Sequence, residues 1–224
     1  MNRSLPIIIV AIVAVVAIGS GVALYRAKSQ PVLTPAAPKE ASSPAQAAAE
    51  LVTSRGPANA SVTLEEFGDF QCPPCGRFSE PINDIARDYK DKLRIVFREL
   101  PLAMHQHARA AAEAAEAAGL QGKFWQMHDL LYREQEEWTK ASDARPIFNS
   151  YAGVLGLNIA RFTKDMSGPQ VLERLASDAA RAQRLGVTNT PTIFVNGTQV
   201  AGTSLNPGGV RAAIDAALAP KPQK

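Results

Sequence analysis

Two cysteines carry the clearest chemical signal in this chain of 224 residues. Cys72 and Cys75 are separated by Pro73 and Pro74, and they lie between a short apolar run and a helical pattern. A helix N-terminus favours a negative group, so a thiolate there has a lowered pKa and is a good nucleophile. The spacing lets the second thiol attack a mixed disulfide made by the first. The pair predicts a redox-active dithiol, with Cys72 as the exposed attacking thiol and Cys75 as the resolving thiol.

Other uses of the two cysteines are less consistent with the sequence. A structural disulfide across so small a loop would remove little entropy from the unfolded chain. A zinc site would need further ligands such as His105, His107 or His128, and the first two would point to different faces of a helix. Carriage of a cuprous ion by the two thiolates stays open as a different class of function. We expect neither a resident metal nor an organic cofactor.

Glu66 lies six residues before Cys72 and shares a strand face with Val62 and Leu64. A carboxyl facing the core would have a pKa raised by desolvation, and it could then accept the proton of Cys75. A partly solvated charge at the strand end fits the same pattern. Glu65 points to the opposite face, and we expect it to be merely polar.

Short β-branched or aromatic runs and two helical patterns outline an α/β domain. An Asn-Gly turn joins the last two runs as a hairpin. The second helix has an asparagine cap and a proline in its first turn. The predicted strands are residues 62–67, 93–98, 192–195 and 198–201, and the predicted helices are about 75–90 and 207–219.

Between the second strand and the hairpin, residues 105–184 show helical periodicity and predict a helical insertion. Within it, the alanine-rich segment 108–118 predicts a helix whose acidic side, with Glu113 and Glu116, faces solvent. Trp125, Met127 and Leu131 recur at helical spacing, which is typical of the core of such an insertion.

The composition is that of an ordinary globular protein. Hydrophobic residues make up 46% and charged residues 20%, and 24 basic against 21 acidic residues give a net charge of +3. Neither a basic arm nor a nucleotide-binding glycine loop is present in the sequence. We therefore expect no nucleic-acid partner.

The first 26 residues predict a membrane anchor. Residues 5–25 carry no charge, and 21 helical residues are long enough to cross a bilayer. A cleaved signal peptide is the alternative, because Arg3 precedes the apolar run and residues 21–23 (GVA) form a possible small-residue cleavage site. Charges on both sides leave the orientation open. Residues 27–50 are rich in alanine and proline and predict a flexible linker.

Three segments together resemble the DsbA-like branch of the thioredoxin superfamily over about residues 51–219. This resemblance implies a thioredoxin fold interrupted by an inserted helical domain at about 105–184, which agrees with the helical periodicity found there. The segments are FGDFQCPPC at 67–75, GKFWQMHDLL at 122–131 and GVTNTPTIFVNG at 186–197.

The resemblance also assigns roles to residues. It implies that Cys72 is the nucleophile, that Cys75 is the resolving cysteine, and that Pro191 follows a cis peptide bond. It places Thr190 beside Cys72 and lets the Thr190-Pro191 turn offer backbone groups to an extended substrate. Members of the family carry an acidic residue at the position of Glu66.

The sequence departs from the family at one position. Strong oxidases of this type have a histidine before the second cysteine, where this chain has Pro74. Proline has no N–H to donate to the Cys72 sulfur. We expect Cys72 to be less acidic, and its disulfide less oxidising, than in those enzymes.

The expected function is a membrane-tethered, extracytoplasmic thiol–disulfide oxidoreductase that introduces disulfides into exported proteins. Its location would be the periplasmic side of a bacterial inner membrane or the cell exterior. Its partners would be exported protein thiols and a membrane redox protein that recycles the active site, and we expect a monomer. A reductase using the same motif is the alternative, whereas the linker-like segment 27–50 disfavours an isomerase with a dimerisation domain.

Overall fold

The computed structural model describes residues 52–220, which contain a five-stranded sheet with the order β1-β3-β2-β4-β5. The central strands β2 and β3 run parallel, and the other neighbouring strands pair antiparallel. Parallel strands need a crossover, and a helix supplies it between β2 and β3. The strands are β1 (Ser54–Arg55), β2 (Val62–Gly68), β3 (Leu93–Glu99), β4 (Thr192–Val195) and β5 (Thr198–Gln199).

Helices cover both faces of this sheet. On one face, α3 (Pro73–Tyr89) and α10 (Pro207–Leu218) share an apolar core with alternate residues of the strands, including Leu64 and Ile95. On the other face, α9 (Pro169–Leu185) packs through Ala182 against Phe67 and Phe194. Strands β2 and β3 are buried along nearly their whole length, as expected for parallel strands covered on both sides.

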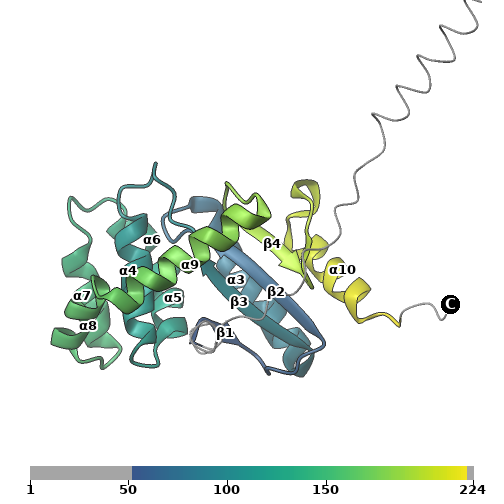
Figure 1. Cartoon of the computed structure of the whole chain (residues 1–224), viewed down its shortest axis with the longest axis horizontal. Coiled ribbons are helices and arrows are strands. Elements are labelled where there is room, and N and C mark those ends of the chain that lie inside the picture. The colour runs from purple at the N-terminus through teal and green to yellow at the C-terminus, as the bar shows by residue number, and fades with distance from the viewer. Residues whose placement is uncertain (1–51, 221–224) are drawn as a thin grey trace, which may run out of the picture. The chain divides into compact units, whose positions relative to one another are not determined.

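The chain between β3 and β4 folds into helices. Figure 1 shows α4 to α8 grouped beyond one end of the sheet, with α9 extending from this group back along the strands. Besides α9, these helices are α4 (Ala108–Gly119), α5 (Phe124–Arg133), α6 (Gln135–Trp138), α7 (Arg145–Val154) and α8 (Ile159–Met166).

The expected strands and helices are confirmed to within a few residues, with two exceptions. β1 was not predicted, because two residues carry no periodic signal. The last strand is shorter than expected, since β5 ends at Gln199. Two segments also form single 3-10 turns, Lys90–Lys92 and Gly202–Ser204.

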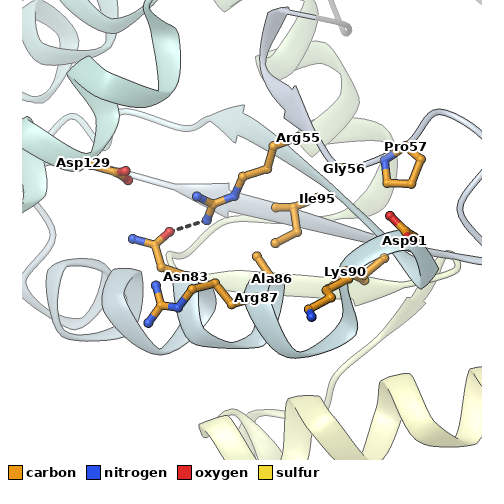
Figure 2. Close-up of a pocket in the computed structure, with 11 residues that line it drawn as sticks. Arg55, Gly56, Pro57, Asn83, Ala86, Arg87, Lys90, Asp91, Ile95 and Asp129 are labelled. Atoms are coloured by element: carbon orange, nitrogen blue, oxygen red, sulfur yellow. Dashed lines mark hydrogen bonds between the residues drawn. The ribbon is translucent and has the colours of Figure 1, made fainter.

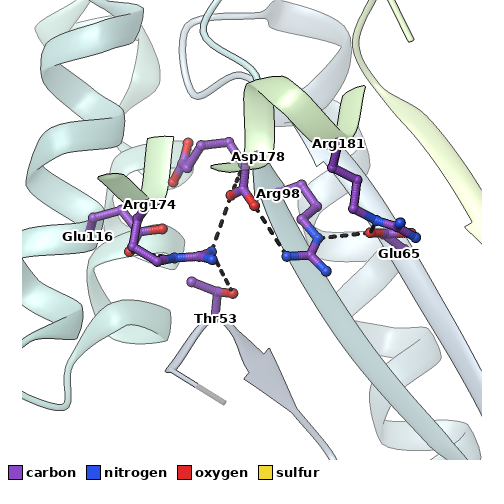
Figure 3. A network of polar contacts seen from close by, with 8 residues as sticks. Thr53, Glu65, Arg98, Glu116, Arg174, Asp178 and Arg181 are labelled. Atoms are coloured by element: carbon purple, nitrogen blue, oxygen red, sulfur yellow. Dashed lines mark hydrogen bonds and ion pairs between the residues drawn. The ribbon is translucent and has the colours of Figure 1, made fainter. Parts of the chain in front are cut away.

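Two expectations about acidic residues are wrong. Glu113 and Glu116 do not face solvent, because α4 is packed between α5, α7, α8 and α9 and is buried almost all round. Glu65, which we expected to be merely polar, is buried and ion-paired. It is 6% exposed and forms ion pairs with Arg98 and Arg181 (Figure 3).

The predicted anchor at 1–26 and linker at 27–50 lie outside the described residues. Within residues 52–220, none of the helices combines the length and the apolar character needed to span a bilayer.

Candidate active site

The two cysteines lie where the sequence places them, at the N-terminus of α3. Cys72 is the N-cap residue, Pro73 and Pro74 open the helix, and Cys75 follows inside its first turn. Both thiols are free. The expectation of an exposed Cys72 is wrong, since it is 4% exposed against 0% for Cys75. Its sulfur lies 3.4 Å from the carbonyl oxygen of Thr190, so the loop before β4 covers it.

The two thiols differ in acidity. A hydrogen bond from the Cys75 thiol is the main cause that lowers the pKa of Cys72 to about 6, with help from Thr190 and the backbone of Cys75 and against the effect of burial. Burial raises the pKa of Cys75 far above its ordinary value, and the neighbouring Cys72 adds to the effect. At neutral pH the site therefore pairs a thiolate on Cys72 with a protonated thiol on Cys75.

The loop before the cysteines is tied to the helical insertion. The buried Asp69 carboxylate accepts hydrogen bonds from the backbone N–H of Gln71 at 2.7 Å and of Leu102 at 2.9 Å, and it contacts His105 Nδ1 at 2.7 Å. Sequence reasoning assigned no role to Asp69, although an aspartate that bonds the backbone two residues on is a recognisable turn signal.

A second tie comes from α6. The Gln135 side chain donates from Nε2 to the carbonyl oxygens of Phe70 at 2.6 Å and of Cys72 at 3.0 Å. The two positions in this contact are more than 60 residues apart in sequence, so no local sequence pattern predicts it.

The turn before β4 faces the cysteines. The Thr190-Pro191 peptide bond is cis. The Cys72 sulfur lies against the Thr190 carbonyl oxygen, and the Thr190 hydroxyl is buried. The structure thus brings Cys72, Cys75, Thr190 and Pro191 together.

Glu66 is buried beneath this site, with 3% of its surface exposed. Burial raises the pKa of Glu66 to about 7, and the positive charge of Arg55 opposes the rise. Figure 2 shows the Arg55 side chain reaching from β1 toward Asn83. Both residues line a cleft with a volume of about 480 Å³. The Arg55 guanidinium lies 4.2 Å from the centre of the Trp125 ring. A carboxyl with a pKa near neutrality can both take up and release a proton.

The histidines lie in other settings. His107 Nε2 contacts the Ala141 carbonyl at 2.8 Å, and His128 is packed among aromatic rings. Within residues 52–220, no group of three metal-ligating side chains lies together.

A thiolate at a helix N-terminus, a buried partner thiol and a facing cis-proline turn on this sheet define a thiol–disulfide oxidoreductase of the DsbA type. Sequence comparison agrees, because the profile of the family described as Thioredoxin matches residues 49–216. The chain belongs to this family.

Solved structures share the fold. A thioredoxin-like oxidoreductase from Silicibacter pomeroyi is 30% identical, with a TM-score of 0.62 over 74% of this chain and 91% of that one. BdbD from Bacillus subtilis is 22% identical, with a TM-score of 0.66 over 74% and 92%. DsbA2 from Pseudomonas aeruginosa is 24% identical, with a TM-score of 0.61 over 77% and 96%. The last two show similarity of fold alone.

Curated relatives are much longer than this chain. A protein named Na(+)/H(+) antiporter NhaA 1 from Salinispora arenicola is 42% identical over 166 residues, which are 74% of this chain and 24% of that protein. A protein named NhaA 3 from Salinispora tropica is 43% identical over 144 residues, 64% and 21%. This chain spans about a quarter of the length of these relatives.

Proposed function

We propose that this protein introduces disulfides into exported proteins, through dithiol–disulfide exchange at Cys72 and Cys75. The observation that carries the proposal is the pKa of about 6 for Cys72, because a more acidic thiol is a better leaving group. A stabilised thiolate favours the reduced enzyme, which makes its disulfide a stronger oxidant.

In the proposed reaction, a client thiolate attacks Cys72 of the oxidised enzyme. The Cys72–Cys75 bond breaks, and Cys75 leaves as a thiolate that takes up a proton. A second client thiolate then attacks the client sulfur of the mixed disulfide, and Cys72 leaves as a thiolate. The client loses two electrons and the enzyme gains them.

Glu66 is proposed as the group that exchanges the proton of Cys75. Its burial below the cysteines and its pKa of about 7 support this role. Thr190 and Pro191 are proposed to bind the client backbone, supported by their position against Cys72.

Recycling is proposed to need a membrane redox partner, because each client leaves the enzyme reduced. A tether of residues 1–26 and a linker of 27–50 would hold the enzyme, as a monomer, beside that partner on the extracytoplasmic side. The uncharged run at 5–25 supports the tether. Antiport is not proposed, because this chain covers only 24% of the first antiporter relative.

A trapping experiment tests the proposed roles of the cysteines. Cys75→Ser is expected to leave Cys72 in mixed disulfides with client proteins, since the resolving thiol is gone. Cys72→Ser is the matched control and is expected to trap almost nothing. Equal trapping by the two variants would contradict the assignment.

The reductase alternative is favoured by one observation. Pro73 and Pro74 open α3 and have no N–H to donate to the Cys72 sulfur, which limits how far the Cys72 thiolate is stabilised. Equilibration with glutathione buffers separates the two directions. A reduction potential of about −120 to −180 mV supports disulfide introduction, whereas about −270 mV supports a reductase. Stoichiometric cuprous binding without any dithiol exchange would instead support the copper carrier.

A further inference from the structure

One buried hydroxyl near the active site has no partner. Among the described residues, the Tyr132 hydroxyl is inaccessible to solvent and makes no hydrogen bond. Buried polar groups are nearly always paired, so an unpaired one in a native structure calls for an explanation. Leaving a donor unsatisfied costs about 1–3 kcal/mol. A functional role would explain why an unpaired hydroxyl is present at this position despite its cost to stability.

The sheet register locates the hydroxyl. A methyl group on Gly68 would lie 3.0 Å from the Tyr132 oxygen, so the hydroxyl sits directly over Gly68. Gly68 follows Glu66 by two residues on β2, and such residues share a face of the strand. On β3, Glu99 pairs with Gly68. The Tyr132 hydroxyl therefore lies on the face of the sheet that carries Glu66, and Tyr132 belongs to the same buried cluster as Cys75.

Ring packing holds the Tyr132 side chain in place. Its ring centre lies 4.9 Å from that of Phe70 and 5.0 Å from that of His128, one turn earlier on α5. Phe70 is two residues before Cys72 in the active-site loop. The hydroxyl is thus positioned by the helical insertion and by the loop that carries the nucleophile.

The ionisable groups that face Tyr132 come from each element around it. They are Cys75 from α3, Glu66 from β2, Glu99 from β3 and Asp69 from the active-site loop, with Cys75 as the strongest influence after burial. Together with burial, they hold the pKa of Tyr132 well above its usual value. The hydroxyl keeps its proton throughout the working pH range, so it can donate a hydrogen bond but cannot act as a base.

We propose that the Tyr132 hydroxyl donates a hydrogen bond to the Cys75 thiolate as this thiolate forms beneath the active site. This inference rests on the proposed exchange at Cys72 and Cys75. In the resolving step, the Cys75 thiol gives its proton to Glu66 and its sulfur attacks Cys72. The bond from Cys72 to the other protein breaks, the Cys72–Cys75 disulfide forms, and the other sulfur leaves as a thiolate. The thiolate on Cys75 is a buried charge, and a hydrogen bond stabilises it.

Tyr132→Phe tests the proposal, because it removes the oxygen and keeps the ring. The reduced full-length protein is mixed with 5,5′-dithiobis(2-nitrobenzoate). Attack by Cys72 releases a first thionitrobenzoate, and attack by Cys75 on the resulting mixed disulfide releases a second. Hydrogen bonds to charged groups contribute about 1.5–3 kcal/mol, so the second release should slow by roughly 10- to 100-fold. The first release should keep the wild-type rate.

Tyr151→Phe is the matched control. Its hydroxyl is also buried and without a partner, and the charges around it are those of Glu137, Glu134 and Arg133 rather than of the cysteines. Both releases should keep their wild-type rates in this variant.

A pH profile separates donation from a structural effect. Without the donor, the second release of Tyr132→Phe should slow at every pH while its rise through about pH 7, which belongs to Glu66, stays in place. A structural defect that altered the burial of Glu66 would move that rise. An unchanged second release overturns the proposal. So does a loss of stability in Tyr132→Phe, because removing an unpartnered buried hydroxyl should leave the free energy of unfolding unchanged or raised.

The same measurement keeps the two proposals apart. If the wild type never makes the second release, the proposed exchange itself fails. If the wild type makes both and Tyr132→Phe matches it, only the role of Tyr132 fails.

Discussion

Glu65 and Glu66 are neighbours on β2 and both are buried. The pKa of the Glu65 carboxyl is lowered, whereas that of the Glu66 carboxyl is raised. Alternation along the strand sends them to opposite faces of the sheet. On the α9 face, burial raises the pKa of Glu65, but hydrogen bonds and charge from Arg181 and Arg98 outweigh it and lower the pKa. On the α3 face, burial dominates and raises the pKa of Glu66 to about 7.

Glu65 belongs to an ion-pair network, which Figure 3 shows as a row of alternating charges between β2, β3, α9 and α4. Arg98 joins Glu65 at 2.8 Å to Asp178 at 3.2 Å. Arg174 continues from Asp178 at 3.2 Å toward Glu116 at 3.6 Å. Each acidic residue in the row lies beside an arginine, whose charge opposes the cost of burying the carboxylate.

The α3 face lacks such pairing around Glu66. Its main charged neighbour is Arg55, which also donates to Asn83 and lies over Trp125. The comparison teaches that burial alone does not decide the charge of a carboxyl. Matched arginines make Glu65 a fixed structural charge, and incomplete compensation leaves Glu66 able to exchange a proton near neutral pH.

Removing Arg98, which pairs with both Glu65 and Asp178, should lower the stability of the protein more than any other change proposed here. Arg98→Met leaves Glu65 and Asp178 each with one cation fewer, and breaking a buried pair costs about 3–5 kcal/mol. Urea unfolding would measure the loss. The reduction potential should stay at the wild-type value, and a shifted potential with unchanged stability would reverse the roles given to the two faces.

Glu66→Gln should act on the reaction instead. General acid–base groups contribute about 100-fold or more, so the second thionitrobenzoate release should slow by roughly that factor at neutral pH. In the wild type this release should rise with pH through about 7, because Glu66 accepts a proton only when it is ionised. The variant should lack that rise.

Glu65→Gln is the matched control for this result. It should lower the free energy of unfolding and leave the second release unchanged, because its carboxylate pairs with arginines on the far face of the sheet. Slowing of the second release in both variants alike would show that the two carboxyls are not functionally distinct.

Glu116 should make the free energy of unfolding depend on pH. Burial raises its pKa to about 7 from the ordinary 4.5, against the charge of Arg174. The folded protein then holds more protons than the unfolded chain between these values, so stability falls as pH rises from about 4.5 to about 7. Glu116→Gln should flatten this fall by on the order of 2 kcal/mol, measured by urea unfolding across that window.

Arg87→Ala should change least. Arg87 pairs with Asp84 on the exposed side of α3, with side-chain exposures of 68% and 48%. Exposed pairs contribute about 0–1 kcal/mol, so both unfolding and the second release should match the wild type. A large effect here would mean that charge on α3 itself, rather than burial, governs the site.

Much of the fold was predictable because its signals are local. The apolar runs of β2, β3 and β4 and the capped helix α10 are found where strand and helix patterns place them. Asn206 caps α10 by accepting a hydrogen bond from the N–H of Gly209, as the sequence suggested. The misreading of Glu113 and Glu116 has a physical cause, since an alanine-rich helix looks the same whether it is exposed or packed on all sides.

The sequence by itself determined the chemistry of this protein. Two cysteines separated by two residues, at the start of a helix that follows a strand, specify a dithiol with one acidic member, because this spacing brings the Cys75 thiol close enough to donate a hydrogen bond to Cys72. The tertiary structure alone decided how protons and charges are distributed around that dithiol. Elements distant in sequence bury Glu66, pair Glu65 with arginines, bring Gln135 to the active-site loop and enclose the Tyr132 hydroxyl. The sequence does not show these contacts, because burial and charge act through space rather than along the chain.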